Sequence, residues 1–158
     1  MNKNFIAAAI LAVTSIAAQA ADAGFYIGAD VGRTKVDDFG KETSVGGFAG
    51  YQFNQNVAVE VGYRDLGTFK IMGFDAKTKQ AAVSVIGSVP FGNGFSAFGR
   101  LGYNNLKVDV RGYSADDNGT LAGIGLGYAF NANVSARVEF QRVANDTKNL
   151  SVGVAYKF

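Results

Sequence analysis

The side chains that could do chemistry in this sequence are carboxylates, amines, guanidinium groups and hydroxyls, because its 158 residues include no histidine and no cysteine. Histidine-based catalysis, thiol chemistry and disulfides are therefore excluded. No constellation of serine and aspartate takes their place. We expect a protein that is not an enzyme and that needs no cofactor.

Clusters of charge could bind ions instead. Asp37–Asp38 and Asp116–Asp117 are acidic pairs that could hold a divalent cation or a metal linked to lipopolysaccharide. Lys70, Lys77 and Lys79 could contact the phosphates of lipopolysaccharide. In each case the simpler alternative is loop charge that water solvates, and no metal site is predicted.

One glycine-rich stretch looks like half of a nucleotide-binding fingerprint. Gly123-Ile124-Gly125-Leu126-Gly127 lacks the spacing of the third glycine and the following helix that such a phosphate site needs. Alternation with a period of two is typical of a strand. We interpret these glycines as one face of a strand that leaves room for Arg137 and its neighbours.

Strands must position these side chains, and residues 57–63 show the pattern most plainly. In Val57-Ala58-Val59-Glu60-Val61-Gly62-Tyr63, large apolar residues alternate with small or charged ones, and successive strand residues face opposite sides of a sheet. A soluble sheet usually presents long polar side chains to water. Here the polar face is cramped, with glycine, alanine and one acid, which is typical of the interior of a membrane barrel.

Eight segments of this kind follow one another, and most are close to the roughly 9–11 residues that a tilted strand needs to cross a bilayer. They cover residues 24–33, 43–53, 57–65, 80–91, 95–107, 120–130, 134–143 and 149–158. Short Asn/Gly turns alternate with longer polar loops. The turns are residues 54–56, 92–94 and 131–133, and the loops are 34–42, 66–79, 108–119 and 144–148. The sequence predicts an all-β fold, an eight-stranded antiparallel up-and-down transmembrane β-barrel, with both termini on the periplasmic side.

Charged residues fall on one face of these strands. The face that would meet lipid carries no charge in its central spans, where an Arg or Lys would cost roughly 2–4 kcal/mol. The opposite face carries the predicted lumenal polar network: Asp30, Glu60, Arg64, Arg100, Arg137 and Glu139. Aromatic residues near the strand ends form a predicted girdle at the two membrane interfaces. The girdle consists of Phe25, Tyr51, Phe53, Tyr63, Phe91, Tyr103, Tyr128, Phe130, Phe140, Tyr156 and Phe158.

The first 20 residues read as a secretory signal peptide, with Lys3, an apolar run over residues 5–13 and the small-residue site Ala18-Gln19-Ala20. A transmembrane anchor is the alternative, but the apolar run is short. We therefore divide the chain into a signal peptide, 1–20, and an outer-membrane β-barrel domain, 21–158. The formal net charge of +2 gives no argument for nucleic acid as a partner.

Several motifs resemble the transmembrane domain of the outer-membrane protein A family. They are residues 47–54, 59–63 and 136–141, and the closing Val152-Gly153-Val154-Ala155-Tyr156-Lys157-Phe158. The resemblance implies that the outer-membrane assembly machinery recognises the last strand. It also implies that Glu60 and Arg137 are the lumenal acid and base that pair across the barrel, and that Arg100 is a further interior arginine.

Two positions depart from this family. Where the resemblance implies an interior lysine and an acid as alternative partners, this chain has Ser88 and Gly127. The partner-switching gate ascribed to the family would lack both groups here. The family also has a peptidoglycan-binding domain, which we expect to be absent because the chain stops at Phe158.

The position of Glu60 and Arg137 predicts their pairing independently of any resemblance. Each lies four residues beyond the last residue of a short turn, Asn56 or Asn133, on strands that face each other across an eight-stranded barrel. They should meet at similar height. With Arg100 and Asp30 they would form a polar plug. The alternative is that the charges only neutralise one another in a wet lumen.

Two functions remain for a small barrel of the outer membrane. The first is a structural or surface-interaction role, with the loops facing outward and a polar plug in the lumen. The second is a narrow, porin-like channel for ions or small solutes. The expected partners are outer-membrane lipids and lipopolysaccharide, the assembly machinery through the C-terminal strand, and an external ligand at the four loops.

Overall fold

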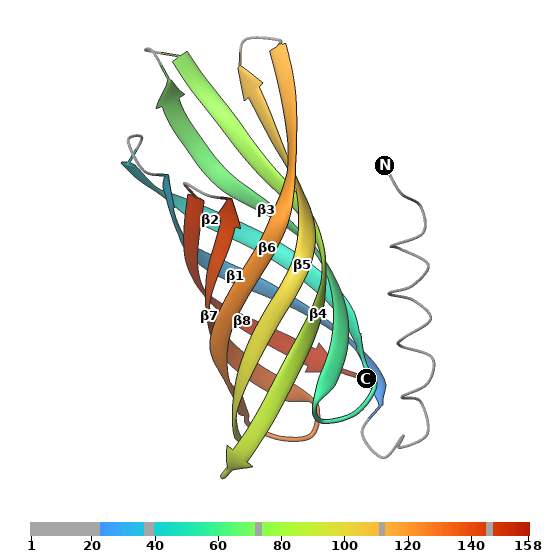
Figure 1. Ribbon diagram of the computed structural model, residues 1–158. Coiled ribbons are helices and arrows are strands. Elements are labelled where there is room, and N and C mark those ends of the chain that lie inside the picture. The colour runs from blue at the N-terminus through green and yellow to red at the C-terminus, as the bar shows by residue number, and fades with distance from the viewer. Residues whose placement is uncertain (1–22, 37–39, 72–73, 111–112, 145–146) are drawn as a thin grey trace, which may run out of the picture.

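The computed structural model describes residues 23–36, 40–71, 74–110, 113–144 and 147–158. Eight strands form a closed barrel, in which each strand pairs with its neighbours in the chain and β8 closes onto β1 (Figure 1). The strands are β1 (Gly24–Val36), β2 (Gly40–Gln52), β3 (Val57–Ile71), β4 (Phe74–Gly92), β5 (Phe95–Val110), β6 (Tyr113–Ala129), β7 (Val134–Ala144) and β8 (Thr147–Lys157). The predicted antiparallel barrel is confirmed. The predicted signal peptide lies outside the described residues.

Strand length is where the sequence prediction was wrong. The central strands are longer than expected, with 15, 19, 16 and 17 residues in β3, β4, β5 and β6. Most residues assigned to loops 34–42, 66–79, 108–119 and 144–148 belong to strands. The prediction ended each strand where its apolar face ended, but backbone pairing does not require an apolar side chain. The hairpins β3–β4 and β5–β6 therefore extend well beyond the others (Figure 1).

Three short turns connect the strands at the opposite end of the barrel, which we call the turn end; the other end is the hairpin end. Asn54 Oδ1 accepts hydrogen bonds from the backbone N–H groups of Asn56 and Val57, at 2.8 and 2.9 Å. Asn131 makes the same two contacts at the turn between β6 and β7. Between β4 and β5, Asn93 has a φ of 53°, which asparagine tolerates better than most residues. The predicted Asn/Gly turns are confirmed.

The barrel is inverted relative to a soluble protein. Large apolar side chains cover its outer surface, among them Ile124, which is 68% exposed, and Val152, which is 53% exposed. Polar and charged side chains fill the interior, where Glu60 and Glu139 are 2% and 1% exposed. The predicted assignment of apolar side chains to the outer face and of charged side chains to the inner face is confirmed. None of the described residues forms a helix long and apolar enough to cross a membrane.

Gly125 illustrates why the inner face carries so many glycines. A Cβ atom on Gly125 would overlap the Phe98 ring and the backbone carbonyl of Val138. Gly99 pairs with Ile124 on the same two strands but faces outward, and a Cβ there would meet nothing within 4 Å. The glycine at 125 is therefore needed for close packing inside the barrel.

A pair of alanine substitutions tests this packing. Gly125→Ala should lower the free energy of unfolding by about 1–3 kcal/mol, the usual range for an overpacked interior. Gly99→Ala should change it by less than about 0.5 kcal/mol, as at an open surface site. The urea midpoint of unfolding of the detergent-folded protein measures both. Equal midpoints for the two variants would show that the inner face has room to spare.

Candidate lumenal site

The candidate site is a cluster of charged side chains in the middle of the lumen, which we call the ion layer. It consists of the six residues predicted as the lumenal network: Asp30, Glu60, Arg64, Arg100, Arg137 and Glu139. They come from four strands, β1, β3, β5 and β7. Five are buried, and Arg137 is half-buried. Three acids and three bases balance, so the layer as a whole carries no net formal charge.

Glu60 accepts contacts from three partners. The Arg137 guanidinium donates to both of its carboxylate oxygens, at 2.7 and 3.1 Å. Arg100 Nη2 lies 2.8 Å from Oε1, and the Tyr26 hydroxyl donates to Oε2 at 3.0 Å. Bidentate pairing of this kind is stronger and more directional than a single hydrogen bond. The structure thus contains the ion pair that the strand positions predict.

Arg100 links two of the three acids of the ion layer, Glu60 and Glu139. Its Nε and Nη2 groups donate to Glu139, at 2.5 and 3.1 Å, while Nη2 also contacts Glu60. A third group, Nη1, donates to the Ser84 hydroxyl at 3.3 Å. Glu139 is further approached by Arg137 Nε at 3.8 Å. Arg100 and Arg137 therefore each face both Glu60 and Glu139, and removal of any one of these four residues leaves a buried charge under-compensated.

Arg64 and Asp30 form a second, bidentate pair nearer the hairpin end. Arg64 Nε and Nη2 donate to the two oxygens of Asp30, at 3.0 and 2.7 Å. The remaining Nη1 donates to Gln141 Oε1 at 2.9 Å. The side chains of both charged partners are at most 8% exposed. This pair joins β1 to β3 and extends the ion layer toward the hairpin end.

Two aromatic residues of the inner face were not predicted as part of the lumenal network. Tyr26 donates to Glu60, and the Phe48 ring lies under Arg137, with the guanidinium carbon 3.6 Å from the ring centroid. The two rings also contact each other edge to face. Tyr26 has the same inward-facing position in the alternation of β1 as Asp30, and Phe48 has that of the inward-facing glycines Gly46 and Gly50 on β2. The alternation of inward-facing and outward-facing residues along each strand is the signal that could have identified them as lumenal.

A second group of side chains fills the lumen on the hairpin side of the ion layer, and we call it the apolar layer. Leu66, Leu106, Leu121 and Val143 form one cluster, and each is at most 8% exposed. They lie toward the hairpin end: Leu121 is one inward-facing step beyond Gly123, the residue paired with Arg100. Asn104 Nδ2 donates to the Val143 carbonyl at 2.8 Å and fastens the layer to β5. The alternation of residues along the strands does not predict this layer.

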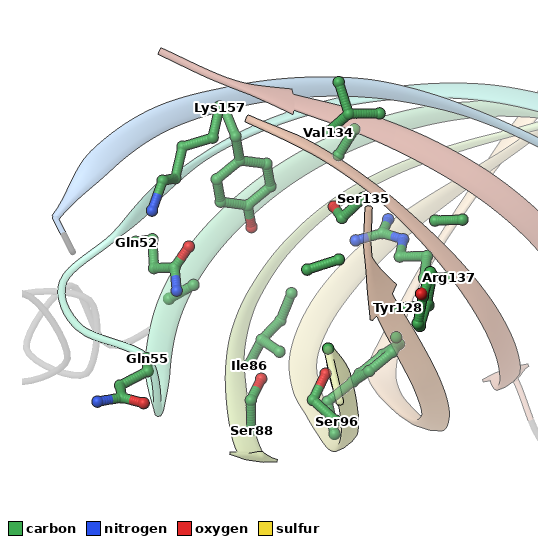
Figure 2. Close-up of a pocket in the computed structure, with 18 of the residues that line it drawn as sticks. Gln52, Gln55, Ile86, Ser88, Ser96, Tyr128, Val134, Ser135, Arg137 and Lys157 are labelled. Carbon is green, nitrogen blue, oxygen red and sulfur yellow. The ribbon is translucent and has the colours of Figure 1, made fainter. Parts of the chain in front are cut away.

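The lumen is open at the turn end and nearly filled within the ion layer. A cavity of about 370 Å³ at the turn end is lined by residues that include Ile86, Ser88, Ser96 and Arg137 (Figure 2). Beyond it, the void among Asp30, Glu60 and the arginines is about 20 Å³, room for about one water molecule. Arg137 lines both spaces and so lies at the boundary between them.

The positions where the family resemblance implied alternative partners lie in the wide cavity. Ser88 and Gly127 line it, and neither carries a charge. The glycine-rich stretch faces the lumen as interpreted, since a Cβ on Gly123 would lie 2.8 Å from Glu139 Oε1. Among the described residues, no group of three or more acids is placed to hold a metal ion. Asp37–Asp38 lies outside the described residues.

The aromatic residues assigned to the girdle lie on the outer surface, mostly at the turn end. There they form ring contacts along and across strands, with centroid distances of 4.8 Å for Phe25–Tyr51 and 5.0 Å for Tyr128–Phe130. Phe95 joins this group through Tyr128 at 4.7 Å and was not predicted. Tyr63, Tyr103 and Phe140 are exposed farther toward the hairpin end, while Phe53, Phe91, Tyr156 and Phe158 complete the turn-end set.

Comparison with known families finds one that covers nearly all of the sequence. A family described as outer membrane protein beta-barrel domain matches residues 5–158. Outer membrane protein A of Yersinia pseudotuberculosis is 31% identical over an alignment that covers 100% of this chain and 56% of the relative. The same protein of Serratia marcescens is 30% identical with the same coverage. The chain thus spans about half the length of these relatives.

Solved structures share the fold. Neisserial surface protein A has a TM-score of 0.63 at 24% identity, with 85% of this chain and 97% of that chain covered. Ail of Yersinia pestis has a TM-score of 0.58 at 18% identity, with 86% and 97% covered. The barrel domain of OprF from Pseudomonas aeruginosa has 0.58 at 16%, with 86% and 99% covered.

Proposed function

This chain belongs to the outer membrane protein beta-barrel domain family, and from that premise we propose that it is a closed barrel with a structural or surface-interaction role. Its location is the bacterial outer membrane, as for the relatives and the solved barrels that it matches. Its termini face the periplasm, and its long hairpins face outward, the usual arrangement of such barrels. No enzymatic role is proposed, because no catalytic constellation is present in the sequence.

The filling of the lumen is the observation that carries this proposal. Two layers with different chemistry lie one above the other inside the lumen. In the ion layer, bidentate contacts fix the arginines and leave a void of about 20 Å³. In the apolar layer, Leu66 and Val143 are 0% exposed. An ion would have to displace both layers and lose hydration in passing the second.

Contacts at the cell surface are supported by the long hairpins. The apolar part of the outer surface, which we call the apolar band, ends below the tips of the long hairpins. Beyond it, strands β3 to β6 carry charged and polar residues, of which Lys77, Lys107 and Asp116 are exposed. Such residues would face the lipopolysaccharide head groups and the medium. At the other end, the last strand closes with the exposed Phe158, in keeping with the proposed recognition of β8 by the assembly machinery.

Efflux from vesicles tests the proposal. The barrel reconstituted into liposomes loaded with potassium should leave the rate of potassium efflux at that of empty vesicles. Glu60→Ala/Arg137→Ala removes the central pair but leaves the apolar layer, so its efflux should stay close to the wild-type rate. Adding Leu66→Ala and Leu121→Ala should raise it. Fast efflux through the wild-type barrel would overturn closure.

A narrow channel is the second candidate, and the cavity at the turn end favours it. That cavity of about 370 Å³ reaches Arg137, so only the two layers separate it from the hairpin end. A rearrangement of the arginines would lengthen the open part of the lumen. Ser88→Ala serves as the matched control, because Ser88 lines the wide cavity and no layer; its efflux should match the wild type in either case.

A further inference from the structure

The cavity at the turn end, which we call the turn-end cavity, contains polar groups that the ion layer does not use. Its volume of about 370 Å³ falls within the range of small-molecule sites, about 300–1,000 Å³. None of the residues that line it is acidic. Arg137 lines it at the boundary with the ion layer. The lining therefore combines hydrogen-bond donors with a cation and offers no carboxylate.

Three serine hydroxyls face the turn-end cavity from three strands. Ser88, Ser96 and Ser135 belong to β4, β5 and β7 and line the cavity together with Arg137 (Figure 2). All three residues are partly exposed. Within the part of the chain that the structure describes, none of the three hydroxyls has a hydrogen-bond partner. Each can therefore donate one hydrogen bond to a molecule in the cavity.

Gly127 leaves an empty place between one of these hydroxyls and the guanidinium group. In the register of the sheet, Ser96 on β5 is opposite Gly127 on β6, and Gly127 is opposite Arg137 on β7. Neighbouring strands lie about 4.7–4.9 Å apart, so the backbones at Ser96 and Arg137 are about 10 Å apart with no side chain between them. A Cβ atom on Gly127 would lie 2.9 Å from Ser96 Oγ. The hydroxyl thus lies over the inner face of the glycine.

Arg137 retains donors for a further acceptor. Its Nη1 and Nη2 each donate to Glu60, and each of these nitrogens carries two N–H groups. Its side chain is 14% exposed, against 4% for Arg100 and 8% for Arg64. Glu60 lines the small void of the ion layer but not the turn-end cavity. An anion in the cavity therefore meets the guanidinium group and not the acid that balances it.

Apolar side chains form another part of the wall. Ile86 and Phe98 line the cavity next to the serines of β4 and β5, and Ile86 is one inward step from Ser88. A ligand that placed an apolar group against these two residues would bury surface that water otherwise covers. Lys157 also lines the cavity. It already takes part in another interaction, so it is not counted among the groups that bind.

We propose that the turn-end cavity binds a small carboxylate with an apolar body. The carboxylate accepts hydrogen bonds from Arg137 and Ser96 in the space over Gly127, and the apolar body lies against Ile86 and Phe98. Charge-assisted hydrogen bonds of this kind are about twice as strong as neutral ones. That the ligand comes from the periplasm rests on the orientation in the proposed function. The binding itself does not depend on whether the lumen is closed.

A titration of the isotope-labelled, detergent-folded barrel with phenylpropanoate tests the proposal. The NMR shifts of the backbone amides of Ser96, Gly127 and Arg137 should change and saturate. Phenylpropanamide has the same body without the charge and should bind at least about fivefold more weakly. Phenylpropylamine, which carries a positive charge, should cause no saturating change at these residues.

Two variants remove the site without removing a member of the ion layer. Ser96→Ala/Ser135→Ala should weaken binding of phenylpropanoate roughly 10-fold, since two hydrogen bonds to a carboxylate are lost. Gly127→Asp places a carboxylate of the chain in the proposed position and should weaken it by at least about 10-fold. Gly127 is not among the residues with positive φ, so its backbone accepts a side chain. Ser151→Ala is the matched control, because Ser151 faces inward on β8 but does not line the cavity; it should change the affinity less than about twofold.

Several results would each overturn the proposal. They are equal affinity for phenylpropanoate and phenylpropanamide, equal losses in Ser151→Ala and Ser96→Ala/Ser135→Ala, and unchanged affinity in Gly127→Asp. Shifts confined to outward-facing amides such as that of Ile124 would indicate partition into the detergent and would also overturn it. Heat-dependent gel mobility confirms that each variant is folded. Efflux is measured separately, so a conducting barrel would contradict closure and leave the binding result intact.

Discussion

Glu60→Ala is expected to lower the free energy of unfolding by about 3–5 kcal/mol, the range for removing one partner of a buried ion pair. Glu60 holds Arg137 by two hydrogen bonds, contacts Arg100 and accepts from Tyr26. Its loss leaves the buried Arg100 and the half-buried Arg137 with Glu139 as their shared acid. Water entering from the cavity at the turn end would lower the cost toward the bottom of that range.

The midpoint of urea unfolding measures this effect. Gel mobility reports the folded fraction, since the chain contains no tryptophan whose fluorescence could be followed. Glu42→Ala is the matched control, since Glu42 is an exposed acid on β2 and its removal should cost no more than about 0.5 kcal/mol. Glu60→Ala/Arg137→Ala should recover part of the loss, because the double variant leaves fewer uncompensated charges. If Glu60→Ala unfolded at the same urea concentration as Glu42→Ala, Glu60 and its ion pairs would not contribute to the stability of the folded barrel.

The second large effect is expected on the outer surface. Ile124→Arg should lower the stability of the lipid-inserted barrel by about 2–4 kcal/mol, the cost of arginine on the lipid face at the midplane. Ile124 lies midway along β6 between Thr120, which is opposite Tyr103, and Tyr128 in the turn-end girdle. Its side chain is 68% exposed, so in the membrane it is in contact with lipid.

Thr120→Arg is the control for depth. Thr120 faces outward on the same strand but at the level of the upper aromatic residues, where arginine costs about 0–1 kcal/mol. Unfolding by urea in vesicles of defined lipid should separate the two variants by at least about 1 kcal/mol. Equal stability would mean that the apolar band is not where the aromatic residues indicate.

The alternation of residues was enough to predict the barrel and the lumenal charges. A period of two assigns Glu60, Arg100 and Arg137 to the inner face without knowledge of partners, because an outward charge in the central spans would meet lipid. The short Asn/Gly turns set the strand order and the height of Glu60 relative to Arg137. These features depend on local sequence, and the structure agrees with them.

Other features depend on contacts that alternation cannot supply. Leu66 and Leu121 face inward by the alternation of their strands, but nothing in the local sequence shows that they meet Leu106 and Val143 inside the lumen. Glu139 takes Arg100 as its partner because Arg100 can reach across from β5 to β7, a matter of side-chain length and packing. Strand ends were misplaced for the same reason: backbone pairing in the hairpins is set by the opposite strand.

The pairing of residues on neighbouring strands shows the same distinction in a different way. Lys35, Lys41, Arg142 and Lys148 are unremarkable charges at the ends of separate segments when read along the sequence. They become one feature only when the register places them directly opposite one another. Register is set by the closed sheet as a whole, which a single strand pattern does not specify.

Planar-bilayer conductance of single inserted barrels tests the central claim, a closed lumen, most directly. Insertion is verified on the same sample by heat-dependent gel mobility. The wild-type barrel should give no discrete current steps, and Glu60→Ala/Arg137→Ala should stay silent or nearly so because the apolar layer remains. The variant with both layers reduced, which adds Leu66→Ala and Leu121→Ala, should conduct. Reproducible steps from the wild-type barrel would contradict closure and make the narrow channel the better account.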